Sequence, residues 1–298
     1  MQQTATPVKK KLTWNKHQFA ETVLYLRVFM TALNKALPTN ERQTLYMIAK
    51  LFTDATVEVN SNRFRVAQHL FERGERYLHA LPDEKVMLKS FLVNVYDRSK
   101  SLYHHRTGDV EKAISLIHHT LNNNRKLEAQ GFHFLLFDRL SQYQNLSRVY
   151  FSAGKKTAAL EMLSDCLVFL LTGQATLLAD LNDHYVKEYD ADMIEMRHSL
   201  ICQLLFETTH RIQQENDAVQ LAADCALFFE PMLQSIHRFM IRKPEEALIK
   251  QWLEIIPLFY RQQSAGLHAA VAAFGLQADA AALYKGIPYK LLEQFTAG

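Results

Sequence analysis

Apolar residues recur at three- and four-residue intervals along most of the chain, which is the spacing of one face of an α-helix. The first such face, in segment 14–37, consists of Phe19, Val23, Leu26, Met30 and Leu33. Similar patterns, separated by polar, glycine or proline turns, predict helices over 41–57, 64–81, 84–106, 132–153 and 156–171. Pro231 and Pro257 lie within further helical patterns, where proline predicts a break or kink. The chain is therefore expected to be all-α.

A turn signature recurs at a fixed interval. Asn62, Gly108 and Gly154 are 46 residues apart (108−62 and 154−108). An alanine follows each turn by five residues and a large apolar residue by nine, at Ala67, Ala113 and Ala159 and at Phe71, Ile117 and Leu163. A fixed period is typical of stacked helical repeats, in which each unit buries its apolar face against its neighbours. The pattern favours an elongated scaffold over a compact catalytic pocket.

The copies resemble tetratricopeptide repeats, a family of helical hairpins. The best copy, 146–167, has the family's residue types at Tyr150, Gly154, Ala159, Leu163 and Cys166. A second copy has Tyr103, Gly108, Asp109, Ala113 and Ile117, and the copies around Asn62 and Asp217 are degenerate. The resemblance covers about half of the chain, and its period is longer than the family's usual repeat of about 34 residues. It implies a right-handed α-α superhelix of about 12 to 14 helices.

The repeat interpretation divides the chain into a tail and one domain. Residues 1–13, with Lys9, Lys10 and Lys11, are expected to form a disordered basic tail, and residues 14–298 a single helical-repeat domain. The expected hairpins are about 41–81, 84–128, 132–172 and 198–241. An alanine-rich C-terminal segment, about 244–298, is expected to cap the last open face, as a solenoid requires.

The resemblance also implies a concave groove, lined by the first helix of each hairpin. Transferred to this sequence, the family's groove positions include Arg98, Leu102, His105, Arg106, Gln144, Arg148, Phe151 and Arg211. Arginine pairs bidentately with carboxylates, so the groove predicts an acidic peptide or a C-terminal carboxylate as ligand, with Leu102 and Phe151 supplying apolar contact. The alternative is that these are solvated surface arginines. The expected function is a non-enzymatic scaffold that binds a protein or peptide and needs no cofactor.

A metal site is the main alternative. Glu195 and His198, like Glu207 and His210, have the Glu-x-x-His spacing of di-iron carboxylate bundles. If 185–211 is one helix, the stripe that contains His184, Glu188, Glu195 and His198 would support a metal-dependent, di-iron-like oxidoreductase. Both motifs lie on that one helix and point apart, which favours a charged solvent face. The histidines at 104, 105, 118 and 119 suggest a weaker zinc or pH-switch hypothesis, and an architectural oligomerisation module is a third possible function.

Composition narrows these hypotheses. The net charge of +3 is too small for a general polyanion binder, so no nucleic acid is expected. Three widely spaced cysteines without a CxxC pair predict reduced thiols in a cytoplasmic protein. The longest uncharged apolar stretch, 166–179, is shorter than the roughly 20 residues that span a bilayer, so no membrane is expected. The chain has no P-loop, dinucleotide fingerprint or Gly-x-Ser-x-Gly motif, which is why no enzymatic activity is expected.

Overall fold

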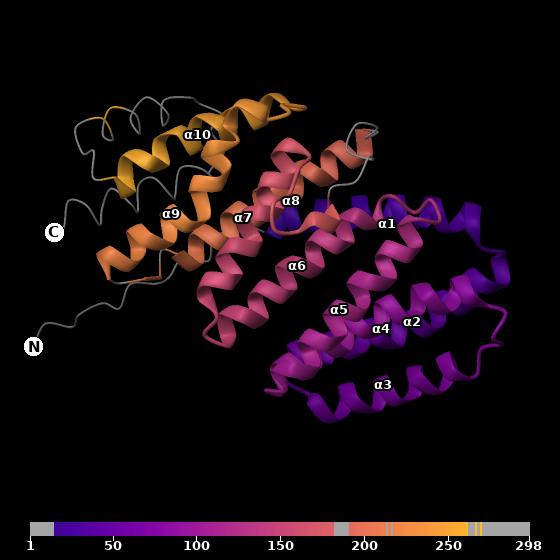
Figure 1. The fold of residues 1–298 in the computed structure, drawn as a ribbon. Helices are drawn as coiled ribbons and strands as arrows, with labels where there is room; N and C mark the ends of the chain where they lie inside the picture. The colour runs from indigo at the N-terminus through magenta and orange to yellow at the C-terminus, as the bar shows by residue number, and fades with distance from the viewer. Residues whose placement is uncertain are drawn as a thin grey trace, which may run out of the picture.

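The computed structural model describes residues 15–181, 191–212, 214–215, 217–261, 266 and 269. These residues form ten α-helices and no strand, so the protein is all-α as predicted (Figure 1). The helices are α1 (Asn15–Ala36), α2 (Thr39–Asn60), α3 (Phe64–His79), α4 (Val86–Arg106), α5 (Val110–Glu128), α6 (Leu135–Ser152), α7 (Lys156–Thr172), α8 (Ala191–Ile212), α9 (Ala218–Gln234) and α10 (Pro244–Tyr260). Two short 3₁₀ turns, η1 (Ala179–Leu181) and η3 (Ile236–Arg238), accompany them.

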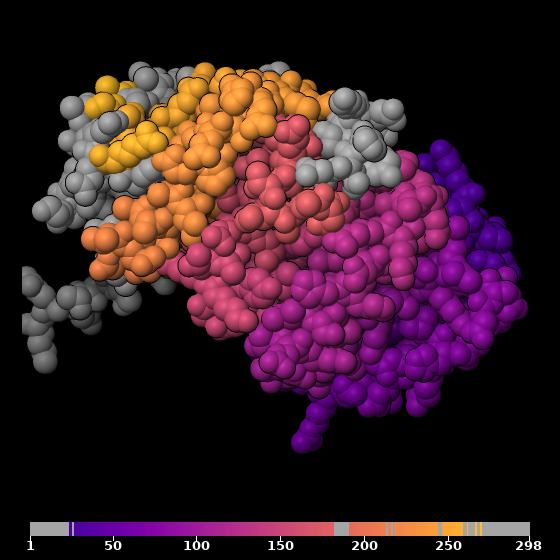
Figure 2. All heavy atoms as spheres, viewed as in Figure 1, coloured from indigo at the N-terminus to yellow at the C-terminus, as the bar shows by residue number. Residues whose placement is uncertain are grey.

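Most helices pack in chain order. α2 packs against α3 and α4, and α5 packs against α4 and α6. The N-terminal helices therefore occupy one end of the molecule and α9 and α10 the other (Figure 2). α1 departs from this order because it also packs against α8, and its Tyr25 and Phe29 rings lie 6.1 and 5.9 Å from the ring of Phe134. This contact joins segments far apart in the sequence, which stacking of neighbours alone would not do.

The turns at the 46-residue interval have the same geometry three times. Asn62, Gly108 and Gly154 have positive φ angles of 57°, 89° and 73°, and Asn62 is the one residue other than glycine with positive φ in the described part of the chain. In each turn the next N–H donates to the carbonyl five residues earlier, in the pairs Arg63–Glu58, Asp109–His104 and Lys155–Tyr150. The hydrogen bond closes the end of the preceding helix. The 46-residue period thus corresponds to the same turn geometry at the ends of three helices.

The third turn offers a direct test of this equivalence. Asparagine occupies the turn position at residue 62, so Gly154→Asn should change the free energy of unfolding by less than about 0.5 kcal/mol. Gly154→Val should lower it by about 1–2 kcal/mol, because a β-branched residue is strained at this φ. No atom lies within 4 Å of a Cβ built there, so the difference isolates the backbone angle from steric overlap. Urea denaturation measures both variants, and equal losses would contradict the argument.

Small residues lie where paired helices cross. Ala67, Ala113 and Ala159 are fully buried. Gly74 of α3 faces the ring of buried Phe52 on α2, which a Cβ at residue 74 would overlap. Overpacking of this kind costs about 1–3 kcal/mol. The close α2–α3 approach therefore depends on the missing side chain.

The prolines at 231 and 257 do not end their helices. The sequence predicts a kink or break at Pro231 and a kink at Pro257, and in the structure α9 continues through Pro231 and α10 through Pro257. Proline costs a backbone hydrogen bond, but Phe228 and Phe229 are fully buried, and this packing holds the helix together. Within the segment of the expected fourth hairpin, about 198–241, α9 packs mainly on α7 and α10 and only lightly on α8. The Phe229 ring lies 5.4 Å from that of Trp252 on α10, so the apolar face of α9 is turned toward α10.

The tail 1–13 and most of the predicted C-terminal cap lie outside the described residues. Within the described part, no helix is both long enough and apolar enough to cross a membrane.

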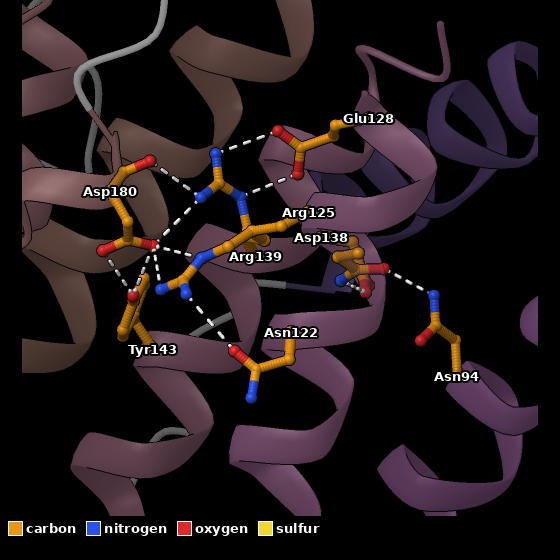
Figure 3. A network of polar contacts seen from close by, with 9 residues as sticks. Asn94, Asn122, Arg125, Glu128, Asp138, Arg139, Tyr143 and Asp180 are labelled. Carbon is orange, nitrogen blue, oxygen red and sulfur yellow. Dashed lines mark hydrogen bonds and ion pairs between the residues drawn. The ribbon is translucent and has the colours of Figure 1, made fainter. Parts of the chain in front are cut away.

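A buried ion network ties α5, α6 and η1 together (Figure 3). Arg139, 1% exposed, contacts the carboxylate of Glu128, 3% exposed, at 2.7 and 2.9 Å. The same guanidinium donates to Asp180 at 3.0 Å, and Asp180 also accepts from the Tyr143 hydroxyl at 2.8 Å and from Arg125. Buried charges are tolerated only when they are paired in this way. The network fixes α6, which carries part of the cleft described next.

Candidate ligand-binding cleft

A cleft of about 750 Å³ opens on the side where the first helices of the pairs lie. Its walls come from α2, α4, α6 and α8, with one residue from α5. The lining residues are Thr53, Thr56, Asn60, Val95, Arg98, Ser99, Ser101, Leu102, His105, Arg106, Ile117, Asn145, Arg148, Val149, Phe151, Ser152 and Arg211. The volume is within the range of about 300–1,000 Å³ that is typical of ligand pockets.

Helical spacing brings the main side chains to the cleft. On α4, Arg98, Leu102 and His105 follow one another at four- and three-residue steps and so share one helix face. On α6, Arg148 and Ser152 share a face for the same reason. The helical spacing on α4 and α6 therefore brings these side chains to one shared surface.

Two of the four cleft arginines are already neutralised. Arg98 donates to Asp138 at 3.1 Å. Arg148 forms a bidentate pair with Glu207 of α8, with Nη2 2.7 Å from both carboxylate oxygens. These pairs cross from α4 to α6 and from α6 to α8, so they hold the cleft walls at fixed separations and add no net charge.

The other two arginines carry positive charge that no described carboxylate neutralises. Arg106, at the exposed end of α4, makes no hydrogen bond or ion pair among the described residues. Arg211 stacks on the ring of Phe151, 4.8 Å from its centroid, and has no described ion pair. Burial lowers the pKa of Arg211; Glu207 opposes this shift, and the nearby Arg148 adds to it. The cleft thus has a local excess of positive charge.

His105 lies next to this positive charge, and its pKa is affected by it. Its Nε2 lies 2.8 Å from Ser152 Oγ, which bridges α4 to α6. Burial, Arg106 and Arg211 together lower the pKa of His105 below its ordinary value of 6.5. A neutral imidazole in an otherwise cationic cleft can accept or donate a hydrogen bond without adding charge.

A chain of three asparagine amides, two of them buried, holds Asp138 in position for Arg98. Asn123 donates to Asn94 at 2.7 Å, Asn94 donates to Asn124 at 2.5 Å, and Asn124 donates to Asp138 at 2.7 Å. Figure 3 shows Asn94 and Asp138 at the edge of the ion network. The three amides donate in sequence toward the carboxylate, and the last of them, Asn124, holds it in place. The orientation of Arg98 is therefore set by residues from three helices.

A second hollow of about 390 Å³ adjoins the cleft and shares Arg98, Asn145 and Arg148 with it. Its other lining residues are Tyr25, Phe137, Asp138, Ser141, Gln144, Met196, Leu200 and Gln203. Gln144 is 3% exposed; its Oε1 accepts from Gln203 at 3.3 Å, whereas its Nε2 has no hydrogen-bond partner among the described residues. Buried amide groups are normally hydrogen-bonded, so this donor is an exception.

The structure brings the sequence-predicted groove residues together. Seven of the eight line the cleft, and Gln144 lines the adjoining hollow. The sequence interpretation missed the α2 wall and the carboxylate partners of Arg98 and Arg148. The α2 wall had a signal: the offsets of six and two residues that give Leu102 and Arg106 before Gly108 give Thr56 and Asn60 before Asn62. Glu207 had a signal as well, since it lies ten residues before Asp217, as Arg98 lies ten before Gly108; its pairing with Arg148 had none, because α6–α8 packing determines that pair.

The residues of the metal hypothesis do not converge in the described part of the chain. Glu195 is exposed and pairs with Lys243, and Glu207 pairs with Arg148. His184 and Glu188 lie outside the described residues. No group of three or more His, Cys, Asp or Glu side chains that could hold a metal ion occurs among the residues that were placed. The four clustered histidines are also separate: His104 contacts Asp109, and His119 contacts Asp97.

His198 instead takes part in a contact between α8 and α10. Its Nε2 lies 3.7 Å from Cys202 Sγ and its Nδ1 3.8 Å from the buried carboxylate of Glu246. Burial opposes the charged imidazole, but the contacts with Cys202 and Glu246 outweigh it and raise the pKa of His198 to about 9. Burial also opposes ionisation of Glu246, but contacts with His198, Arg197 and the Arg242 N–H lower its pKa to about 2.

The raised pKa of His198 gives a pH-dependent stability prediction. A group whose pKa is higher in the folded state stabilises the fold fully below the unfolded value of 6.5, and this contribution is lost as the pH rises through about 9. His198→Gln should therefore lower the free energy of unfolding by on the order of 1–2 kcal/mol in acidic buffer. Denaturant titrations should show the two proteins converging above the folded-state pKa. A deficit that does not change with pH would show that the imidazole is not charged in the fold.

Comparison of the chain with protein-family models, with curated proteins and with solved structures gave no match. The cleft geometry is therefore the basis for assigning a function.

Proposed function

We propose that the protein is a non-enzymatic binding module whose cleft recognises an acidic segment of a partner protein. The observation that carries this proposal is the pair of cleft arginines, Arg106 and Arg211, whose charge no described carboxylate neutralises. Their guanidinium groups supply planar donors that match carboxylate geometry. Phe151, with Arg211 stacked on it, and Leu102 give the same surface an apolar floor.

The shape of the cleft supports a chain segment over a compact small molecule. Residues from α2, α4, α6 and α8 all contribute, so the lining extends across four helices. Hydroxyl and amide side chains, including Thr53, Thr56 and Asn145, alternate with the arginines and can bond to a peptide backbone. The three cysteines are free, two of them buried, which supports a reducing, cytoplasmic setting.

An array of synthetic peptides tests the proposal. It would carry acidic, neutral and basic sets that share the same apolar residues and length, together with a single-stranded RNA as a competing polyanion. We expect wild-type protein to retain the acidic set about tenfold or more above the neutral set, with the excess declining as salt is raised. Equal retention of the three sets, or displacement of all acidic peptides by the RNA at lower concentration, would contradict the assignment.

A further inference from the structure

The hollow differs from the cleft in its electrostatics. Both of its arginines are neutralised, Arg98 by Asp138 and Arg148 by Glu207. One wall of the hollow is apolar and consists of Tyr25, Phe137, Met196 and Leu200. The cleft, in contrast, retains the charge of Arg106 and Arg211. A ligand that spans both spaces therefore meets positive charge in the cleft and, in the hollow, a surface without net charge that has one apolar wall.

Gln144 gives the hollow a specific polar feature. Its side chain is almost fully buried, its oxygen is occupied by Gln203, and its amide nitrogen has no acceptor among the described residues. An unsatisfied buried donor destabilises the fold, and a ligand acceptor in the hollow would remove that cost. Both arginines of the hollow are already paired, so a buried carboxylate there would have no free countercharge, and a neutral carbonyl oxygen suits this donor better.

We infer that the hollow is an anchor subsite for the same acidic peptide, taking one apolar side chain while a peptide carbonyl accepts a hydrogen bond from Gln144 Nε2. The inference rests on the proposed function and adds a specificity: the partner segment carries a bulky apolar residue next to its acidic residues. The hollow, at about 390 Å³, and the cleft, at about 750 Å³, meet at Arg98 and Arg148, so these paired arginines lie between the two subsites.

The test uses acidic peptides that differ at one position, which is scanned along the peptide and carries leucine, phenylalanine or serine. Burying such a side chain contributes about 1.5–3 kcal/mol, so at one position the apolar peptide should bind roughly tenfold or more tightly than its serine counterpart. Fluorescence anisotropy with wild-type protein measures this gain. The gain is the readout for the hollow, and the affinity of the serine peptide is the readout for the cleft.

Two variants test whether the affinity gain of the apolar peptide arises in the hollow. Ser141→Phe fills the hollow and should abolish the gain while leaving the serine peptide bound. Gln144→Leu keeps a similar volume but removes the donor, and should weaken binding of the apolar peptide about three- to tenfold. Ser115→Phe, on the exposed face of α5, is the matched control and should change neither affinity. Circular dichroism and denaturation confirm that each variant is folded.

The outcomes separate this inference from the proposed function. If acidic serine peptides bind but no position gives an apolar gain, or if the gain survives in Ser141→Phe, the anchor subsite is wrong and the cleft stands. If binding follows the apolar residue and ignores peptide charge, the acidic-segment function is wrong. If no peptide binds, both are wrong.

Discussion

Replacing Arg139 by methionine is expected to lower the free energy of unfolding by about 3–5 kcal/mol, the largest stability loss we predict for this chain. The substitution removes the guanidinium that contacts the carboxylates of Glu128 and Asp180. The Arg139 side chain is only 1% exposed, so water cannot take the place of these contacts. Asp180 keeps Arg125 and Tyr143, so the main penalty falls on the buried carboxylate of Glu128. Thermal and urea unfolding of the two proteins measure the loss.

A double variant tests whether the loss comes from buried charge. Replacing a whole buried ion pair with apolar residues is often close to neutral, so Glu128→Leu combined with Arg139→Met should recover a large part of the stability. Arg65→Met, at an exposed position on α3, is the control and should change stability by less than about 0.5 kcal/mol. A single Arg139→Met variant as stable as wild type would show that the network in Figure 3 does not support the fold.

Reversing the charge of Arg106 and Arg211 together should weaken binding of an acidic peptide by about 100-fold or more, since opposing charges then become like charges across the interface. Neither arginine has a described ion-pair partner, so Arg106→Glu and Arg211→Glu break no described ion pair. Substituting Arg98 or Arg148 would be less informative, because each is paired inside the protein, with Asp138 and Glu207. Fluorescence anisotropy of one peptide from the acidic set measures the change.

The matched control reverses two arginines elsewhere. Arg65→Glu and Arg76→Glu, both exposed on α3, change the net charge by the same amount but lie outside the cleft. This variant should keep most of the wild-type affinity in physiological salt, where charges separated by more than about 8 Å are largely screened. If both double variants lost the same affinity, overall charge, and not the cleft, would explain the binding.

The local features of the fold were predictable from the sequence because each depends on few residues. A tight helix pair is indicated by a glycine or asparagine at a left-handed turn, followed five residues later by an alanine. The structure places Asn62, Gly108 and Gly154 in such turns. The offsets from these turns also located the cleft side chains of α4 and α6. Local sequence alone specifies both the turn and the helix face.

The remaining features depend on contacts between distant segments. The contact of α1 with α8 and the continuation of α9 through Pro231 follow from packing, which outweighs local preference. The sequence interpretation gave four arginines equal roles, but partners on other helices neutralise Arg98 and Arg148 and leave Arg106 and Arg211 available. No spacing in the sequence distinguishes these two classes of arginine.

The most direct test of the cleft is a charge-swap titration. An acidic peptide and its counterpart with every acidic residue changed to lysine are titrated against wild-type protein and against the Arg106→Glu, Arg211→Glu variant. We predict that wild-type protein prefers the acidic peptide and that the variant prefers the lysine peptide, with the preference inverting while both proteins remain equally folded. If the variant lost the acidic peptide without gaining the lysine peptide, or if both proteins kept the same preference, the peptide would not bind against Arg106 and Arg211.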